Sequence, residues 1–406
     1  MRMLLLLLAL ALLSAPGLAQ TPAAAPAQAS QTVDSVASLV GRLDLGKYKA
    51  TIKALTTFGD RRQGTLRNRK AVAWIETQLK RYGCSNVERL HYTYTAPPSS
   101  RPRSDTAMVP VIASGEVRGG VGGSRYRGIT KATGVNTDPN RQPDEKLRAL
   151  DSEPASDGAR DDVYCTKIGS THPEEMYLVG AHLDGHGWGE AANDDGSGVA
   201  LVMELARVFN LPGVKTERSI RFVLWNNEET GLNGSQAYVD QRAALQGIES
   251  PKGSGKYPEP RWLAMIQHDM MLWDHGMPRA DGSWNPEQRP EADVNIEFQS
   301  KSKFADAAMK LGFFFREANE KYATDYPAAV GSHMTNTDST PFMDRVPALS
   351  LRENERGMQT GAGWNPTWHQ PMDVYSMFSD KDFRLGLNAA QTTLGAVGQL
   401  AGASLK

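Results

Sequence analysis

Histidine and carboxylate side chains follow two apolar segments of strand length in the middle of the chain. His182 and Asp184 come directly after one apolar run, and Glu228 and Glu229 follow the next run. Because open α/β sheets carry their functional groups at the carboxyl ends of strands, these side chains are expected at one edge of a sheet. Imidazole and carboxylate are zinc ligands, so the pattern predicts a metal site there.

A polar loop lies between these two segments and adds further carboxylates. It reads Asn193-Asp194-Asp195-Gly196-Ser197-Gly198 and opens a strongly apolar segment of helical length. Further along, Asp269 follows another apolar run, and His369 lies in a tryptophan-containing stretch. Taken singly, such residues are more often structural, as a hydrogen-bonded strand end, a solvated turn or a helix cap. Their combination is what indicates a metal site.

These motifs, in this order, resemble metallopeptidase family 28, which includes secreted bacterial leucyl aminopeptidases, glutamate carboxypeptidases and the non-catalytic transferrin receptor. The resemblance covers most of residues 40–400 and rests on five motifs. They are His182-Leu183-Asp184, Asn193-Asp194-Asp195-Gly196-Ser197-Gly198, Asn227-Glu228-Glu229-Thr230-Gly231-Leu232-Asn233-Gly234-Ser235, Asp269-Met270 and His369.

The resemblance implies a ligand set for two zinc ions. His182 and Asp269 would hold one ion, Glu229 and His369 the other, and Asp194 would bridge them. A zinc pair of this kind shares a water, lowers its pKa and polarises the scissile carbonyl of a peptide. The resemblance also implies a cis peptide bond directly after the bridging aspartate.

With this ligand set, the resemblance implies that Glu228 is the general base. Neighbouring residues of an extended chain point to opposite sides, so Glu228 and Glu229 need a turn to serve one cavity, and Gly231 lies where that turn is expected. Asp184 stands two residues after His182, on the same side of an extended strand. Its carboxylate is predicted to accept the second ring N–H of His182 and so to orient the imidazole.

Further residues are candidates for supporting roles. Asp373 is a second candidate for orienting an imidazole, because it follows His369 by four residues. His333 is the rival of His369 as a ligand and a candidate for substrate binding, since Thr337-Asp338-Ser339 stands here where many family members have Ser-Asp-His. The remaining histidines are assigned to the surface or to the surroundings of the ligands: His91, His172, His186, His268 and His275.

Segments of strand length alternate with segments of helical spacing, which indicates an α/β fold. We expect a single domain over 33–403, with a mixed, mostly parallel sheet flanked by helices on both faces, and an insertion at about 97–161. Helices are expected after a cap at Asn68, over 304–322 and after a cap at Asp380. Strands are expected at 87–94, 108–113, 162–168, 176–181, 219–225, 262–271, 294–298 and 348–351.

The N-terminal residues have the pattern of an export signal. An apolar run over 3–13 precedes small residues at the positions that a signal peptidase reads, so 1–19 is a predicted signal peptide. The run is too short for the alternative, a membrane anchor. Residues 20–32 are Ala/Pro/Gln-rich and are expected to form a disordered leader. Export to the periplasm or medium permits a disulfide between Cys84 and Cys165, the only cysteines; the alternative is two buried thiols.

The charge balance limits the class of partner. Lys plus Arg number 45 and Asp plus Glu 46 among 406 residues, with no basic run. This predicts neither a nucleic-acid partner nor, after signal cleavage, a membrane partner.

The favoured function is that of a secreted dizinc exopeptidase that hydrolyses the N-terminal bond of peptides. A dizinc carboxypeptidase or dipeptidase is the first alternative, because Arg352 and Arg356 offer a positive charge to a substrate carboxylate. Acyl transfer of the glutaminyl cyclase type, with one zinc, and a non-catalytic binding module are the others.

Overall fold

The structure is a computed structural model that describes residues 34–96, 139, 142–186, 189–273, 294–323, 325–334, 336–353 and 367–405. The expected signal peptide, the leader, the strand at 108–113 and most of the insertion therefore lie outside the described residues. Residues from Asp34 onward belong to one compact unit. Among the described helices, none combines the length and the apolar character needed to cross a membrane.

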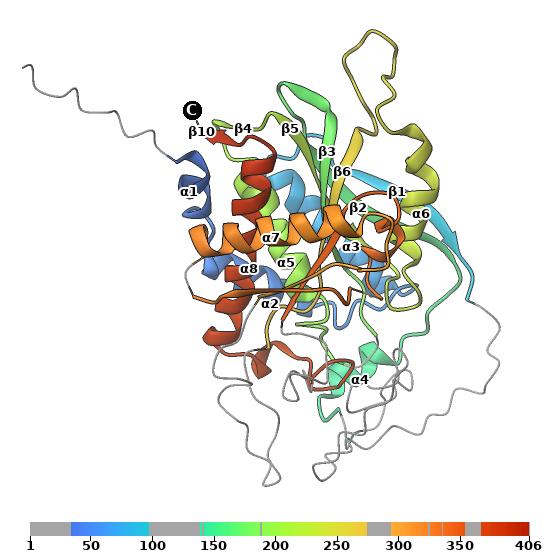
Figure 1. The fold of residues 1–406 in the computed structure, drawn as a ribbon. Coiled ribbons are helices and arrows are strands. Elements are labelled where there is room, and N and C mark those ends of the chain that lie inside the picture. The colour runs from blue at the N-terminus through green and yellow to red at the C-terminus, as the bar shows by residue number, and fades with distance from the viewer. Residues whose placement is uncertain are drawn as a thin grey trace, which may run out of the picture. The chain divides into compact units, whose positions relative to one another are not determined.

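An eight-stranded mixed sheet forms the centre of this unit (Figure 1). Its strands are β1 (Glu88–Tyr94), β2 (Gly158–Lys167), β3 (His172–His182), β5 (Arg218–Trp225), β6 (Arg261–His268), β7 (Val294–Glu297), β8 (Ala328–Gly331) and β9 (Ala348–Glu353). The order is β1-β2-β5-β3-β6-β9-β7-β8. The β5-β3-β6-β9 block and the β7-β8 pair are parallel, and the other neighbours are antiparallel. A separate two-stranded sheet joins β4 (Val214–Lys215) to β10 (Ser404–Leu405). The predicted α/β fold is confirmed.

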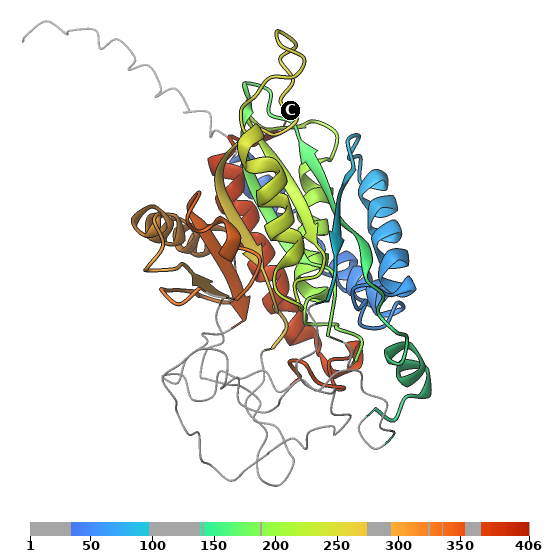
Figure 2. The ribbon, with the colours of Figure 1, turned by 90° about the vertical axis from the view of Figure 1, so that its right-hand side faces the viewer.

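Helices cover both faces of the sheet, as Figures 1 and 2 show. They are α1 (Ser35–Val40), α2 (Leu45–Thr56), α3 (Leu66–Arg81), α4 (Glu145–Asp151), α5 (Gly196–Phe209), α6 (Asn233–Arg242), α7 (Ala305–Tyr322) and α8 (Asp380–Leu400). In β3, Val179 and Ala181 pack into the larger core with α5 and α8, whereas Met176 and Leu178 pack with Tyr238 of α6. This alternation is the period of two that a strand buried on both faces requires.

The caps of two helices differ from the prediction. Thr65, not Asn68, caps α3, and its hydroxyl accepts the backbone N–H of Asn68 at 3.2 Å. Asn68 lies inside the helix, where its side chain donates to Asn226 at 3.0 Å. Ser379 likewise caps α8 one residue before Asp380. In both cases a hydroxyl on an extended residue takes the capping position ahead of the predicted residue.

The predicted link between the two cysteines is confirmed. Cys84 and Cys165 form a disulfide, with their Cα atoms 6.1 Å apart. Cys165 lies in β2, and Cys84 stands four residues before the start of β1. These two strands pair antiparallel, with Glu88 opposite Tyr164. The pairing of β1 with β2 therefore brings together two cysteines that are 81 residues apart in the chain.

Candidate metal centre

Three neighbouring strands deliver the predicted ligands to one edge of the sheet. His182 is the last residue of β3, and Asp269 directly follows β6. Glu229 follows β5 after a short turn, and Asp194 stands just before α5. His369 comes from the segment between β9 and α8. The five side chains converge, although they come from positions between His182 and His369 in the sequence.

The carboxylate of Asp194 lies between two imidazoles. His182 Nε2 is 3.2 Å from Asp194 Oδ1 and 3.8 Å from Asp269 Oδ1. His369 Nε2 is 3.1 Å from Asp194 Oδ2 and 2.9 Å from Glu229 Oε2. Each Asp194 oxygen therefore faces a different histidine, which is the arrangement that a bridging carboxylate needs.

The donor set fits divalent cations. Four carboxylates, those of Asp194, Glu228, Glu229 and Asp269, lie in one largely buried cluster. The Oε1 atom of Glu229 is buried and has no hydrogen-bond partner among the described residues. Buried carboxylates are costly unless cations or donors balance them. Imidazole and carboxylate oxygens are ligands that zinc takes, so these residues suit zinc.

Burial and mutual proximity shift the ionisation of these groups. Burial raises the pKa of the Glu228 carboxyl well above its ordinary value, against the opposing effect of His182. For His369, burial favours the neutral ring, but the carboxylates of Glu229 and Asp194 prevail and raise its pKa to about 9. Metals bind the deprotonated forms, so cation binding here releases protons.

The turn predicted for the adjacent glutamates is present. Asn227 adopts a positive φ of 66°, and the backbone N–H of Gly231 donates to the Glu228 carbonyl at 2.8 Å. Gly231 itself has a φ of 123°, which favours glycine. Because the chain turns here, Glu228 and Glu229 both reach the same cavity.

Asp184 does not orient His182 in the predicted way. The Nδ1 atom of His182 lies 3.0 Å from the backbone carbonyl oxygen of Asp184, whereas the nearer carboxylate oxygen is 3.9 Å away. The prediction assumed an extended chain through Asp184, but β3 ends at His182. The carboxylate instead accepts the backbone N–H of Glu228 at 3.0 Å.

Asp373 also has a different task from the predicted one. Its two oxygens accept the backbone N–H groups of Asn193, at 2.8 Å, and Asp194, at 3.0 Å. It therefore holds the backbone of the Asn193–Asp194 loop and not the ring of His369. The peptide bond between Asp194 and Asp195 is cis, as the resemblance implied. Asp195 accepts the backbone N–H of His182 at 3.1 Å.

His369, and not its rival His333, stands beside Asp194 and Glu229. His333 is exposed and forms an isolated β-bridge with Gln299. The structure does not bring His333 to either of the two cavities next to the ligands. Its assignment to substrate binding therefore rests on the sequence alone.

Two small cavities adjoin the cluster. The first, of about 30 Å³, is lined by His182, Asp194, Glu228, Glu229, Asp269, Asn336, Trp368 and His369. The second, of about 10 Å³, is lined by Asp60, His186, Gly189, Ala191, Asp194, Glu229, His369, Gln370 and Asp373. Asp194, Glu229 and His369 are common to both, so these three side chains separate the two spaces.

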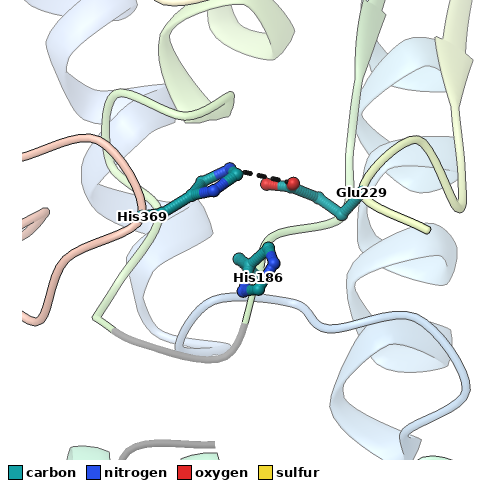
Figure 3. Close-up of side chains that lie close together, drawn as sticks. All are labelled: His186, Glu229 and His369. Carbon is teal, nitrogen blue, oxygen red and sulfur yellow. Dashed lines mark ion pairs between the residues drawn. The ribbon is translucent and has the colours of Figure 1, made fainter. Parts of the chain in front are cut away.

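Arg61 is a residue of the centre that the sequence pattern does not indicate. The fully buried Arg61 donates to the carbonyl oxygens of Leu183 and Ala191, at 2.9 and 2.8 Å, and so holds the loop between His182 and Asp194. No local pattern marks it. His186, which the sequence assigns to the surface or to the surroundings of the ligands, lies in those surroundings, with its ring centroid 4.3 Å from that of His369 (Figure 3). Its place four residues after His182 was the available signal.

Comparisons with known proteins agree with this geometry. The sequence profile of peptidase family M28 matches residues 162–391, more than half of the 406-residue chain. A segment of 93 residues is 43% identical to the probable lipoprotein aminopeptidase LpqL of Mycobacterium tuberculosis and covers 22% of this chain and 18% of that protein. Carboxypeptidase Q of Xenopus laevis is 36% identical over 73 residues, 18% of this chain and 16% of its own. The chain thus aligns with less than a fifth of the length of either relative.

A solved structure extends the likeness to the fold. The aminopeptidase from Aneurinibacillus sp. strain AM-1 superposes with a TM-score of 0.58 at 19% identity, over 91% of this chain and 97% of that one. At this identity the superposition shows a common fold alone. An activity has to be argued from the residues of the site. Profile, fold and converging ligands agree, and the chain belongs to peptidase family M28.

Proposed function

We propose that the protein is a zinc exopeptidase that removes N-terminal residues from peptides. The observation that carries this proposal is the position of Asp194, with one oxygen toward His182 and the other toward His369. In the proposal, His182 and Asp269 hold one zinc ion, Glu229 and His369 hold a second, and Asp194 contacts both.

The chain's own residues supply the proton transfers. Bound zinc would polarise the scissile carbonyl and lower the pKa of the attacking water. Glu228 lines the larger cavity together with the proposed ligands of both ions. It would take a proton from the water and deliver it to the leaving amine, as a general base and then a general acid. The Asp184 carboxylate holds the backbone of Glu228 during both transfers.

The buried position of Arg352 argues against the carboxypeptidase alternative. Its guanidinium lies 2.9 Å from the Asp269 carboxylate and is 1% exposed, so it is engaged with a proposed metal ligand. It does not reach out to a substrate carboxylate. The other candidate, Arg356, lies outside the described residues.

The other two alternatives are less consistent with the cluster. A glutaminyl cyclase of the single-zinc type needs only one of the two ligand groups, whereas His182 and His369 both face Asp194 here. A non-catalytic binding module does not need Glu228, which is retained. Export through a signal peptide at 1–19 remains part of the proposal, and N-terminal sequencing of the mature protein tests it.

Hydrolysis of matched substrates tests the proposed activity. Leucyl p-nitroanilide with a free amine should be hydrolysed, its N-acetyl form should not, and a chelator should abolish the reaction until zinc is returned. N-blocked peptides and peptides with N-terminal glutamine, followed by mass spectrometry, complete the panel. Release of C-terminal residues from the blocked peptides, or loss of ammonia from the glutaminyl peptide without peptide cleavage, would overturn the proposal.

A further inference from the structure

His186 lies beside the proposed second metal position but outside the five-residue ligand set. Ligand atoms of His186, Glu229 and His369 all lie within 4.8 Å of one another. Figure 3 shows the three side chains grouped together, with His186 next to the Glu229–His369 ion pair. His186 reaches this place from the loop that follows β3.

Two further observations indicate that a cation belongs among these three side chains. The second cavity, of about 10 Å³, is lined by all three of them, which is space on the scale of a single water or ion. Glu229 Oε2 faces His369 at 2.9 Å, whereas its buried Oε1 has no hydrogen-bond partner among the described residues. A buried carboxylate oxygen without a hydrogen-bond donor is a position that a cation can occupy.

We propose that His186 is an additional ligand of the metal ion held by Glu229 and His369. This inference rests on the proposed function for the presence of the ion, but it concerns a residue that the ligand set of the family does not include. The ion would then have two imidazoles and the carboxylates of Glu229 and Asp194, whereas its neighbour would have the single imidazole of His182.

The spacing is compatible with this assignment. Zinc–nitrogen and zinc–oxygen bonds of about 2.0 to 2.2 Å place the ligand atoms of a tetrahedral ion roughly 3.3 to 3.6 Å apart. The ligand atoms of His186, Glu229 and His369 lie within 4.8 Å of one another, and small side-chain rotations would shorten these separations to the required values. No movement of the strand ends is required, because His186 and His369 both come from loops.

The extra imidazole makes the two positions chemically different. Imidazole favours zinc, copper and nickel, whereas carboxylate and water suit manganese and magnesium. The position next to His186 should therefore hold zinc more tightly and accept manganese less readily than it would with one imidazole. The proposal thus predicts a specific loss of zinc affinity when the nitrogens of His186 are removed.

Ring stacking offers His186 a second role, and the experiment must separate the two. Trp368 already stacks on His369, with centroids 4.0 Å apart, and His186 lies 4.3 Å from the same ring. His186→Phe keeps a flat ring but offers no ligand atom, and His186→Asn removes the ring. His172→Phe is the matched control, because the His172 side chain is 41% exposed and its ring nitrogen lies 3.4 Å from Glu174, at the opposite end of β3 from His182.

Zinc stoichiometry, zinc affinity and X-ray absorption spectroscopy of the intact protein give the answer without an activity measurement. With His186 as a ligand, the wild type loaded with two zinc ions should show about 1.5 imidazoles per zinc, and His186→Phe about 1.0. One of the two zinc affinities should fall at least about 10-fold in both His186 variants, since even residues behind the ligands contribute 10- to 100-fold. His172→Phe should bind zinc as the wild type does.

The outcomes are distinct. A wild-type value of about 1.0 imidazole per zinc overturns the proposal without any variant, so a variant that fails to fold does not leave it undecided. Zinc affinity that is kept in His186→Phe and lost in His186→Asn assigns His186 to stacking and also overturns it. Two zinc ions bound without His186 leave the proposed function standing, whereas a protein that binds no zinc overturns both.

Discussion

The backbone N–H of Glu228 donates a hydrogen bond to the Asp184 carboxylate across 3.0 Å. Asp184 lies just after β3, and Glu228, to which we assign proton transfer, lies just after β5. The side chain of Asp184 therefore fixes the backbone of Glu228. Asp184 is fully buried, and burial raises the pKa of its carboxyl to about 7. The Asp184 carboxylate thus holds the turn after β5, whereas His182 contacts the backbone carbonyl oxygen of Asp184.

Asp184→Ala is expected to destabilise the protein by about 1 to 3 kcal/mol, because it leaves a buried backbone N–H without an acceptor. Asp184→Asn keeps an acceptor oxygen at the same place and should recover most of this loss. Denaturant unfolding of the metal-free protein measures both. Equal stability of Asp184→Ala and the wild type would show that the hydrogen bond does not hold the turn.

The two adjacent glutamates should respond differently to substitution. Glu228→Gln should keep both zinc ions and lose about 10² to 10⁴ in turnover, which added zinc does not restore. Glu229→Ala removes a proposed ligand, so it should bind less zinc and regain part of its activity in excess metal. Metal analysis and kcat with and without added zinc check both. A zinc-depleted, metal-rescued Glu228→Gln beside a zinc-replete Glu229→Ala would reverse the two roles.

Much of the metal cluster was predictable because its residues follow strands. A parallel sheet places successive strand ends at one edge, so the apolar runs predict where His182, Glu229 and Asp269 lie, and the family resemblance implies that they are ligands. The structure brings the three together as expected. The sequence does not show the path of the chain just after His182 or around His369, so the partners predicted for Asp184 and Asp373 are wrong.

The supporting hydrogen bonds were not predictable, since they join segments that are distant in the sequence. Arg61 contacts carbonyl groups more than 120 residues away. Glu353, at the end of β9, accepts from the side chain of Asn193 at 3.0 Å. Neither residue belongs to a motif, and both follow from tertiary packing. Buried polar groups of this kind are satisfied only once the whole sheet is assembled.

The disulfide should stabilise the metal-free protein in an oxidising solution. It closes a loop of 81 residues, for which chain entropy gives a nominal contribution of about 4 kcal/mol. Reductant, or replacement of Cys84 and Cys165 by serine, should lower the free energy of unfolding by up to that amount. The double serine variant should no longer respond to reductant. A wild type that is equally stable with and without reductant would contradict the prediction.

His268 lies in the core, directly before the proposed ligand Asp269. It is fully buried, with Nδ1 3.2 Å from the Gly180 carbonyl and Nε2 2.8 Å from the Thr393 hydroxyl. Burial lowers its pKa to about 4, whereas a histidine in the unfolded chain has a pKa of about 6.5. Between these values the unfolded chain takes up a proton that the folded protein does not, so this group makes folding less favourable as the pH falls.

The size of the effect follows from the same linkage. One pKa unit corresponds to about 1.4 kcal/mol, so the contribution of His268 that is present at pH 7 should fall by roughly 2.4 kcal/mol as the pH falls to about 4.5. His268→Gln keeps hydrogen-bonding groups but does not titrate, so the stability difference between wild type and variant should shrink by that amount. Denaturant unfolding with chelator present measures it, and His172→Gln, at an exposed site, serves as the control. Parallel pH profiles for wild type and His268→Gln would show that His268 keeps an ordinary pKa in the folded protein.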